Sequence, residues 1–151
     1  MAKSKTYRKN AINTRKNRAT GSLDQFQKQI TIVFFEMLLM VKLYHWKTTS
    51  YATHKATDEL YTKINVNMDS FVEVLLGKSG VRTDLMSNKH IRLVDLTSAE
   101  ALKREIDGFK GYLMGLNDNK AMKKMFNTDL FNIRDTILGD LNQFLYLLTF
   151  K

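Results

Sequence analysis

Four side chains that can bind a metal ion recur along one stretch of the sequence at intervals close to whole helical turns. His54, Asp58, Asp69 and Glu73 are separated by four, eleven and four residues, so in an α-helix they project at neighbouring angles. Imidazole and carboxylate groups together suit iron, manganese or zinc. His45, just before this stretch, could supply one more nitrogen. The spacing indicates a helical metal site; the alternative, a solvated edge with a His54–Asp58 pair worth roughly 0.2–0.5 kcal/mol, stays open.

The helix that carries these groups is predicted by an apolar stripe beside them. The stripe has the three- and four-residue intervals of a helix face packed on a core, and its members are Leu60, Ile64, Met68, Phe71 and Leu75. Gly77 is a suitable residue to end the helix, and Gly80 allows a further turn. The ionisable groups therefore border a buried face.

Another helix is predicted before this one, because Ser22 and Gln25 form a capping box and an apolar pattern follows to about Lys47. Residues 30–41 are apolar on almost every side, yet this run is shorter than the roughly 20 residues that cross a bilayer. We expect it to be buried on two sides, by its own domain and by another subunit. Glu36 within it is expected to be either a paired core carboxylate or a ligand.

Two further helices follow a long connection at residues 81–96. The first begins at a second capping box, Thr97 with Glu100, and the last covers residues 129–150. Residues 117–128 between them are predicted to be a polar, basic connection. Three glycines inside the third helix, which a close neighbouring backbone would explain, are Gly108, Gly111 and Gly115. With no proline to break these patterns, the fold class is all-α and residues 22–151 form one domain.

Residues 1–21 form a basic N-terminal arm without one acidic residue. Seven charges there account for most of the formal +9, namely Lys3, Lys5, Arg8, Lys9, Arg15, Lys16 and Arg18. The arm has too few apolar groups to order itself, so we expect disorder unless a partner holds it. Such arms bind phosphates or an acidic protein surface. A secretory signal does not fit, while a basic organelle presequence stays open.

Several kinds of chemistry have no support in the sequence. The chain has no cysteine, which excludes disulfides and thiolate zinc sites. It also lacks the phosphate-binding loop, the HExxH zinc motif and the nucleophile elbow. The Glu-x-x-His motifs of the large di-iron bundle enzymes are missing too.

The pattern of His45-Trp46, His54 with Asp58, and Asp69 with Glu73 resembles the metal-binding pattern of Dps-type mini-ferritins. That resemblance covers Leu23 to Lys151 and is specific over residues 43–80. It implies a ferritin-like four-helix bundle with one long crossover connection, which residues 81–96 fit. It also implies iron at a subunit interface, with both histidines and Asp58 of one subunit facing Asp69 and Glu73 of its two-fold partner. The connection KTTSYATH is shorter than in the pattern, so we expect His45 to be displaced and iron turnover to be weak or absent.

The segment YHWKTTSYATHKATDELY most closely resembles the Dps-like proteins encoded by large DNA viruses and phages. We therefore expect a structural or interaction component of a large viral assembly, virion- or capsid-associated, whose arm contacts neighbours or nucleic acid. One alternative is a mini-ferritin that binds and oxidises iron(II) and protects or coats DNA; another is a DNA-packaging protein without metal chemistry. The expected partners are further copies, other assembly proteins and DNA through residues 1–18. The expected location is the virion or the host cytoplasm or nucleus, without secretion or a membrane span.

Overall fold

The computed structural model describes residues 22–85, 88 and 90–150, and the basic arm lies outside them. Every regular element in this part of the chain is helical, which confirms the all-α prediction. The four long helices are α2 (Leu23–Lys47), α3 (Tyr51–Ser79), α4 (Ala99–Met114) and α6 (Thr128–Leu147). Two short elements, η2 (Gly115–Asp118) and α5 (Lys120–Lys123), lie between α4 and α6.

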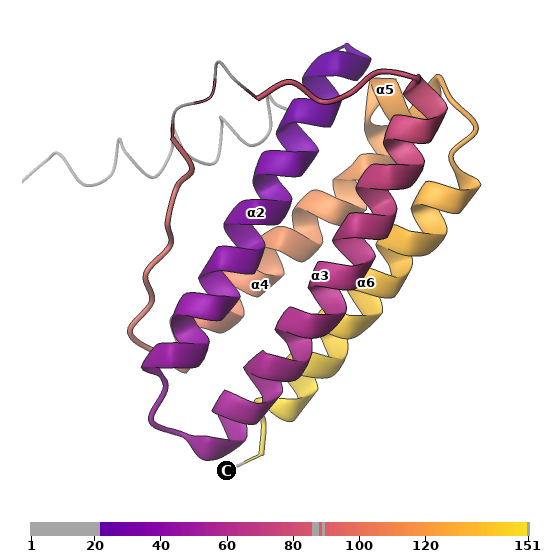
Figure 1. Cartoon of the computed structure of the whole chain (residues 1–151). Helices are drawn as coiled ribbons and strands as arrows, with labels where there is room; N and C mark the ends of the chain where they lie inside the picture. Colours follow the sequence, from indigo (N-terminus) through magenta and orange to yellow (C-terminus); the bar gives the residue numbers. More distant parts are fainter. Residues whose placement is uncertain (1–21, 86–87, 89, 151) are drawn as a thin grey trace, which may run out of the picture.

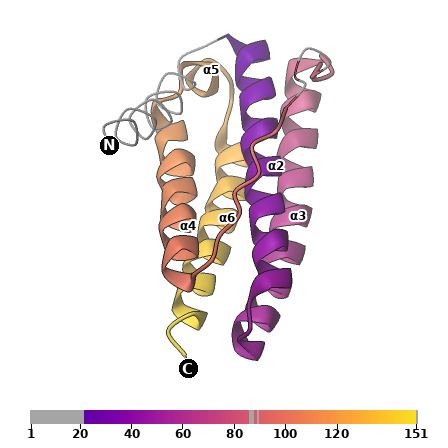
Figure 2. The ribbon, with the colours of Figure 1, turned by 90° about the vertical axis from the view of Figure 1, so that its left-hand side faces the viewer.

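The long helices form two antiparallel pairs, α2 with α3 and α4 with α6 (Figure 1). Residues 48–50 join the first pair tightly, whereas the connection after α3 travels along the length of α2 before α4 begins (Figure 2). Because of this long connection, α3 and α4 run in the same direction. Helix α3 packs against both α2 and α6. The end of α6 lies at the same end of the molecule as the α2–α3 connection (Figure 1).

Side-chain caps mark where the helices begin, and a glycine marks where α3 ends; one cap and this end differ from the sequence prediction. Ser22 caps α2 as predicted, since its Oγ accepts a hydrogen bond from the Gln25 amide at 3.4 Å. Helix α4 is capped by Ser98, not Thr97, and Ser98 Oγ accepts from the amide of Ala101 at 3.2 Å. The end of α3 is Gly80, not Gly77, because Gly80 takes the left-handed conformation (φ 67°) that glycine adopts at little cost.

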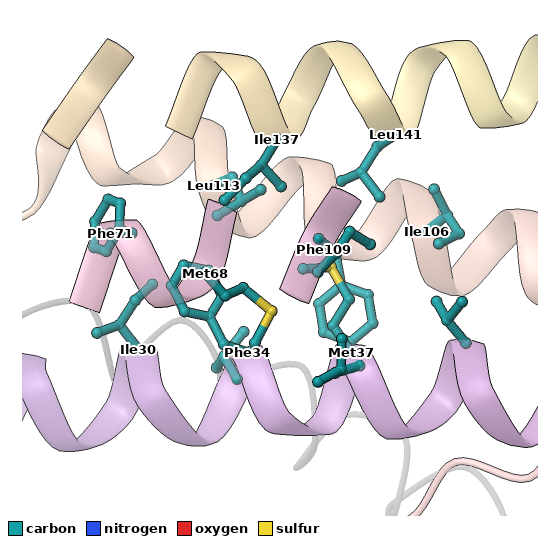
Figure 3. Close-up of a cluster of buried hydrophobic side chains, with 14 of the residues drawn as sticks. Ile30, Phe34, Met37, Met68, Phe71, Ile106, Phe109, Leu113, Ile137 and Leu141 are labelled. Atoms are coloured by element: carbon teal, nitrogen blue, oxygen red, sulfur yellow. The ribbon is translucent and has the colours of Figure 1, made fainter. Parts of the chain in front are cut away.

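The core is built from the predicted apolar stripes of all four long helices (Figure 3). Every member of the α3 stripe is buried, and so is the α4 stripe at Leu102, Ile106, Phe109 and Leu113. Phe34 of α2 meets Phe71 of α3 edge to face, with ring centroids 5.4 Å apart. A fully buried side chain of this size contributes about 1.5–3 kcal/mol. The core therefore fixes how α2 and α3 lie against each other.

The structure corrects two predictions about the second half of the chain in part. The polar connection at residues 117–128 does join α4 to α6, but it contains the end of η2 and all of α5, and Met122 of α5 is fully buried. The Asn119 side chain makes this possible, because its Oδ1 accepts from the amides of Ala121 and Met122 at 2.9 and 3.1 Å. Gly111 and Gly115 do not face a close backbone, since a Cβ added at either would meet nothing within 4 Å.

None of the described helices combines the length and the apolar composition needed to span a membrane.

Candidate metal site at the α2–α3 hairpin

Two histidines from different helices stack on each other at one end of the α2–α3 pair. His45 lies in the last turn of α2 and His54 in the first turn of α3. Their ring centroids are 3.9 Å apart and the ring planes differ by 21°. The short connection between them therefore leaves the two rings in direct contact.

Each ring is held by the backbone carbonyl of the other histidine. His45 Nδ1 lies 3.0 Å from the His54 carbonyl oxygen, and His54 Nδ1 lies 3.0 Å from the His45 carbonyl oxygen. A carbonyl oxygen can only accept, so we assign the ring hydrogen to Nδ1 in both residues. In the neutral ring the lone pair is then on Nε2. This is how metal-binding histidines are commonly oriented, with Nδ1 hydrogen-bonded to a carbonyl and Nε2 available.

Thr57, which was not predicted from the sequence, supports the same arrangement. Its Oγ1 lies 3.2 Å from His45 Nδ1 and donates to the Thr53 carbonyl at 2.8 Å, so it accepts a share of the His45 N–H. Thr57 is fully buried and His45 is 8% exposed. The signal in the sequence was a hydroxyl residue three positions after His54 and one position before Asp58. A buried threonine there fixes the His45 ring.

Asp58 is close to the histidine pair but does not touch it. Its Oδ1 lies 3.9 Å from His45 Nε2, which is longer than a hydrogen bond. Asp58 is exposed and borders a hollow of about 610 Å³ that Glu59 and Lys63 also line. The 2.8 Å contact of Lys63 with Glu59 raises the pKa of Lys63. Glu59 is thus neutralised by Lys63, while Asp58 is left to face His45.

Asp69 and Glu73 lie on the same helix as Asp58 but away from the histidines. Both are exposed, and neither makes a hydrogen bond or ion pair with a described residue. Asp69 is eleven residues beyond Asp58, which is about 16 Å along a helix. Over the described part of the chain, no three His, Asp or Glu side chains converge to hold a metal ion. A single copy thus brings His45 and His54 together with Asp58 nearby, and leaves Asp69 and Glu73 apart.

The side of the α2–α3 pair that carries Asp69 is also apolar, since Asp69 and Phe35 line the same groove, and we call it the outer face. The exposed fractions of its large side chains on α2 are 42% for Phe35, 38% for Leu39 and 69% for Trp46. These three positions recur at intervals of four and seven residues, so they follow one side of α2. A groove of about 150 Å³ runs between α2 and α3, with a lining that comprises Thr31, Phe34, Phe35, Leu38, Asn65, Met68, Asp69 and Val72.

Glu36 has neither of the roles expected for it within one copy. Its side chain is only 6% exposed, which confirms the prediction that it is buried. However, it makes no hydrogen bond or ion pair with a described residue, and it belongs to no group of potential metal ligands there.

The fold and the site together define an all-helical protein with a histidine pair at the end of one helical hairpin. The chain belongs to the family of unknown function DUF5856, which matches residues 45–148. The matched region begins at His45 and contains all five candidate ligands. No curated protein and no solved structure matches the chain.

Proposed function

We propose that this protein is a ferritin-like, Dps-type subunit whose copies pair through the outer face and bind iron(II) between them. The two antiparallel helix pairs and the single long connection along α2 are what a ferritin-like four-helix bundle requires. The observation that carries the function is the reciprocal hydrogen bonding of His45 and His54. It leaves two imidazole Nε2 atoms available beside one carboxylate.

The proposed site needs two copies because of the spacing on α3. His45, His54 and Asp58 form one half, and Asp69 and Glu73 of a second copy form the other. A two-fold axis perpendicular to α3 brings the halves together twice, so each pair of copies has two equivalent sites. Two imidazoles and three carboxylates are a donor set suited to iron(II). Iron is the substrate in this proposal, and its electrons pass to dissolved oxygen or peroxide.

The test is anaerobic calorimetric titration of the full chain with iron(II), followed by an oxygen pulse. We expect binding near neutral pH, loss of binding in acid because the ligands must be deprotonated, and oxidation faster than in buffer alone. His54→Ala and Asp69→Asn should each abolish binding. Asp107→Asn is the matched control, because Asp107 is an exposed carboxylate on α4, paired with Lys110 at 3.2 Å. Absence of heat and of accelerated oxidation in the native chain would refute the proposal.

A mixing experiment tests whether the two halves come from different copies. Asp58→Asn and Asp69→Asn chains, each inactive alone, are denatured together and refolded in equal amounts. About half of the resulting pairs are mixed, and each mixed pair has one intact site among its two, so about one quarter of the native iron binding should return. If both halves belonged to one copy, no binding would return.

A second candidate function is a structural component of a larger, virion- or capsid-associated assembly. It is favoured by large apolar side chains exposed away from the outer face: Phe126 is 92% exposed and Leu93 61%. Further copies or other proteins would cover them, and the basic residues at positions 3–18 would contact neighbours or nucleic acid. Light scattering of the full chain separates the two, because iron-free particles much larger than a pair, unaffected by His54→Ala, favour the structural role.

A further inference from the structure

We propose that Trp46 is the anchor of the outer face and seats in the α2–α3 groove of a second copy of this chain. This inference rests on the proposed function, because the two-fold pairing places the groove opposite Trp46. Trp46 is the only tryptophan of the chain and is 69% exposed. Burying an aromatic side chain removes about 150–250 Å² from water, and tryptophan is among the residues most often dominant in interfaces.

The position of the two-fold axis follows from the proposed metal site. If Asp58 of one copy meets Asp69 of the other, the axis crosses α3 midway between them, near residues 63 and 64. Contacts between the helices give the matching level on α2. The Phe34 ring packs on Phe71, and Lys42 Nζ lies 4.5 Å from the centre of the Tyr61 ring.

Residues 63 and 64 lie between those two contacts and closer to the Lys42–Tyr61 contact, so the axis crosses α2 near Leu39. Trp46 is seven residues beyond Leu39, about 10 Å along the helix. The two-fold rotation moves it the same distance to the other side, to the level of residue 32. Thr31 and Phe35, which flank that level, both line the groove.

The size and the charge of the groove fit this occupant. An apolar cavity of about 150 Å³ can hold a benzene-sized ring, and the groove, being open to solvent, can admit the larger indole edge first. Asp69 is the only charged residue among its described lining residues. Trp46 brings a compensating charge with it, because Lys42 Nζ lies 5.9 Å from the centre of its ring. In the iron-free pair, the same contact would therefore place the aromatic anchor in a pocket and Lys42 beside Asp69.

The experiment uses the emission of the single tryptophan in the full chain. On dilution from the paired to the single state, Trp46 emission should move to longer wavelength and its quenching by acrylamide should increase. Trp46→Ala should weaken pairing about 30-fold or more, the loss expected for a central anchor. Tyr146→Ala, which removes a similarly exposed aromatic on α6, is the control and should leave pairing unchanged.

A groove variant shows whether the seat is the one proposed. Val72→Arg fills the groove without altering Trp46, and it should expose Trp46 and weaken pairing. Met114→Arg, which adds the same charge at an exposed apolar residue of α4 outside the groove, should do neither.

The position of the axis is tested separately by Leu39→Cys in this cysteine-free chain. Only a residue near a two-fold axis can form a disulfide with the same residue of the second copy. If Leu39→Cys forms the cross-link but acrylamide quenches Trp46 equally in the cross-linked pair and in the single native chain, the anchor is overturned and the proposed function stands. Absence of any pairing would overturn both. Pairing with a shielded Trp46 that Val72→Arg does not expose would overturn the groove as its seat.

Discussion

Helices α2 and α4 each place one face on the core, but their opposite faces differ in character. The exposed side of α2 presents Phe35, Leu39 and Trp46. The exposed side of α4 is charged or lacks side chains, apart from Met114, and includes Glu100, Arg104, Asp107, Gly108 and Gly111. Ion pairs such as Lys103–Glu100, with a 3.2 Å contact, lie on α4, where water surrounds them. The α4 surface is that of a solvated helix, whereas the α2 surface needs a partner to cover it.

The same contrast separates the metal ligands from the other carboxylates. Many carboxylates elsewhere on the surface have lysine or arginine partners. Asp129, for example, contacts Lys78 at 2.9 Å, and this hydrogen bond lowers the pKa of Asp129. Asp69 and Glu73 have no such partner among the described residues. Unpaired carboxylates next to exposed aromatic groups are what an incomplete ligand set at an interface would leave in a single copy.

The largest effect we predict is DNA binding by the basic arm. It would break the contrast between α2 and α4, because the protein would then associate through charge and not only through the apolar surface of α2. If the seven basic residues of the arm each contact a phosphate, duplex DNA affinity should fall about 10³–10⁵-fold between 50 and 200 mM salt. Deletion of residues 2–18 should abolish most of this binding and flatten the salt dependence. Filter binding or fluorescence anisotropy at several salt concentrations measures it. Full-length protein with no DNA affinity at low salt would make the arm a protein-docking segment.

The second prediction tests the apolar side of α2 directly. Leu39→Asp should weaken pairing at least about 100-fold, because a charge without a partner would be buried at the axis. Its effect on the fold of one copy should be small, since Leu39 is 38% exposed.

Met114→Asp on α4 is the matched control, because Met114 is 53% exposed and lies on the surface that we regard as solvated. Sedimentation equilibrium of both variants decides the matter. Equal losses in the two variants would remove the distinction between α2 and α4.

The third prediction concerns the buried charge of α2. Glu36→Leu should raise the free energy of unfolding by about 1–3 kcal/mol, because the change removes a buried carboxyl group that has no hydrogen-bond partner among the described residues. Urea denaturation measures the change, and Glu100→Leu at an exposed position should change stability by less than about 0.5 kcal/mol. Loss of pairing or of iron binding on Glu36→Leu would instead mean that a second copy or a metal ion satisfies this carboxylate.

The helices and the core were predictable because both follow from periodicity. Each α3 residue placed on the inward stripe, from Leu60 to Leu75, is buried. Periodicity does not fix helix ends, where a single residue decides: Gly77 and Gly80 are equally suitable in sequence, and only the backbone shows which one has a positive φ. Helix α5 was missed because four residues are too few for a periodic pattern.

The candidate site was predictable in composition and only partly in geometry. The intervals between His54, Asp58, Asp69 and Glu73 are close to whole helical turns, so the sequence alone placed all four on one side of α3. The contact between His45 and His54 depends on the path of residues 48–50, which no spacing rule describes. Whether Asp69 and Glu73 complete the site depends on where a second copy docks. The helical periodicity of one chain does not predict that position.

The smallest effect we predict is at a glycine of α4, and it tests whether the exposed surface of this helix is solvated. Gly111→Ala should raise the free energy of unfolding by up to about 1 kcal/mol, because alanine favours the helix and a Cβ there meets nothing within 4 Å. Gly80→Ala is the opposite control and should cost about 1–2 kcal/mol, since φ at Gly80 is positive. Thermal unfolding of both variants, with oligomer mass measured in parallel, gives the answer. If Gly111→Ala lowers stability or disrupts the oligomer, then the glycines of α4 admit a close neighbour that a single copy lacks, and α4 is a second contact surface of the assembly.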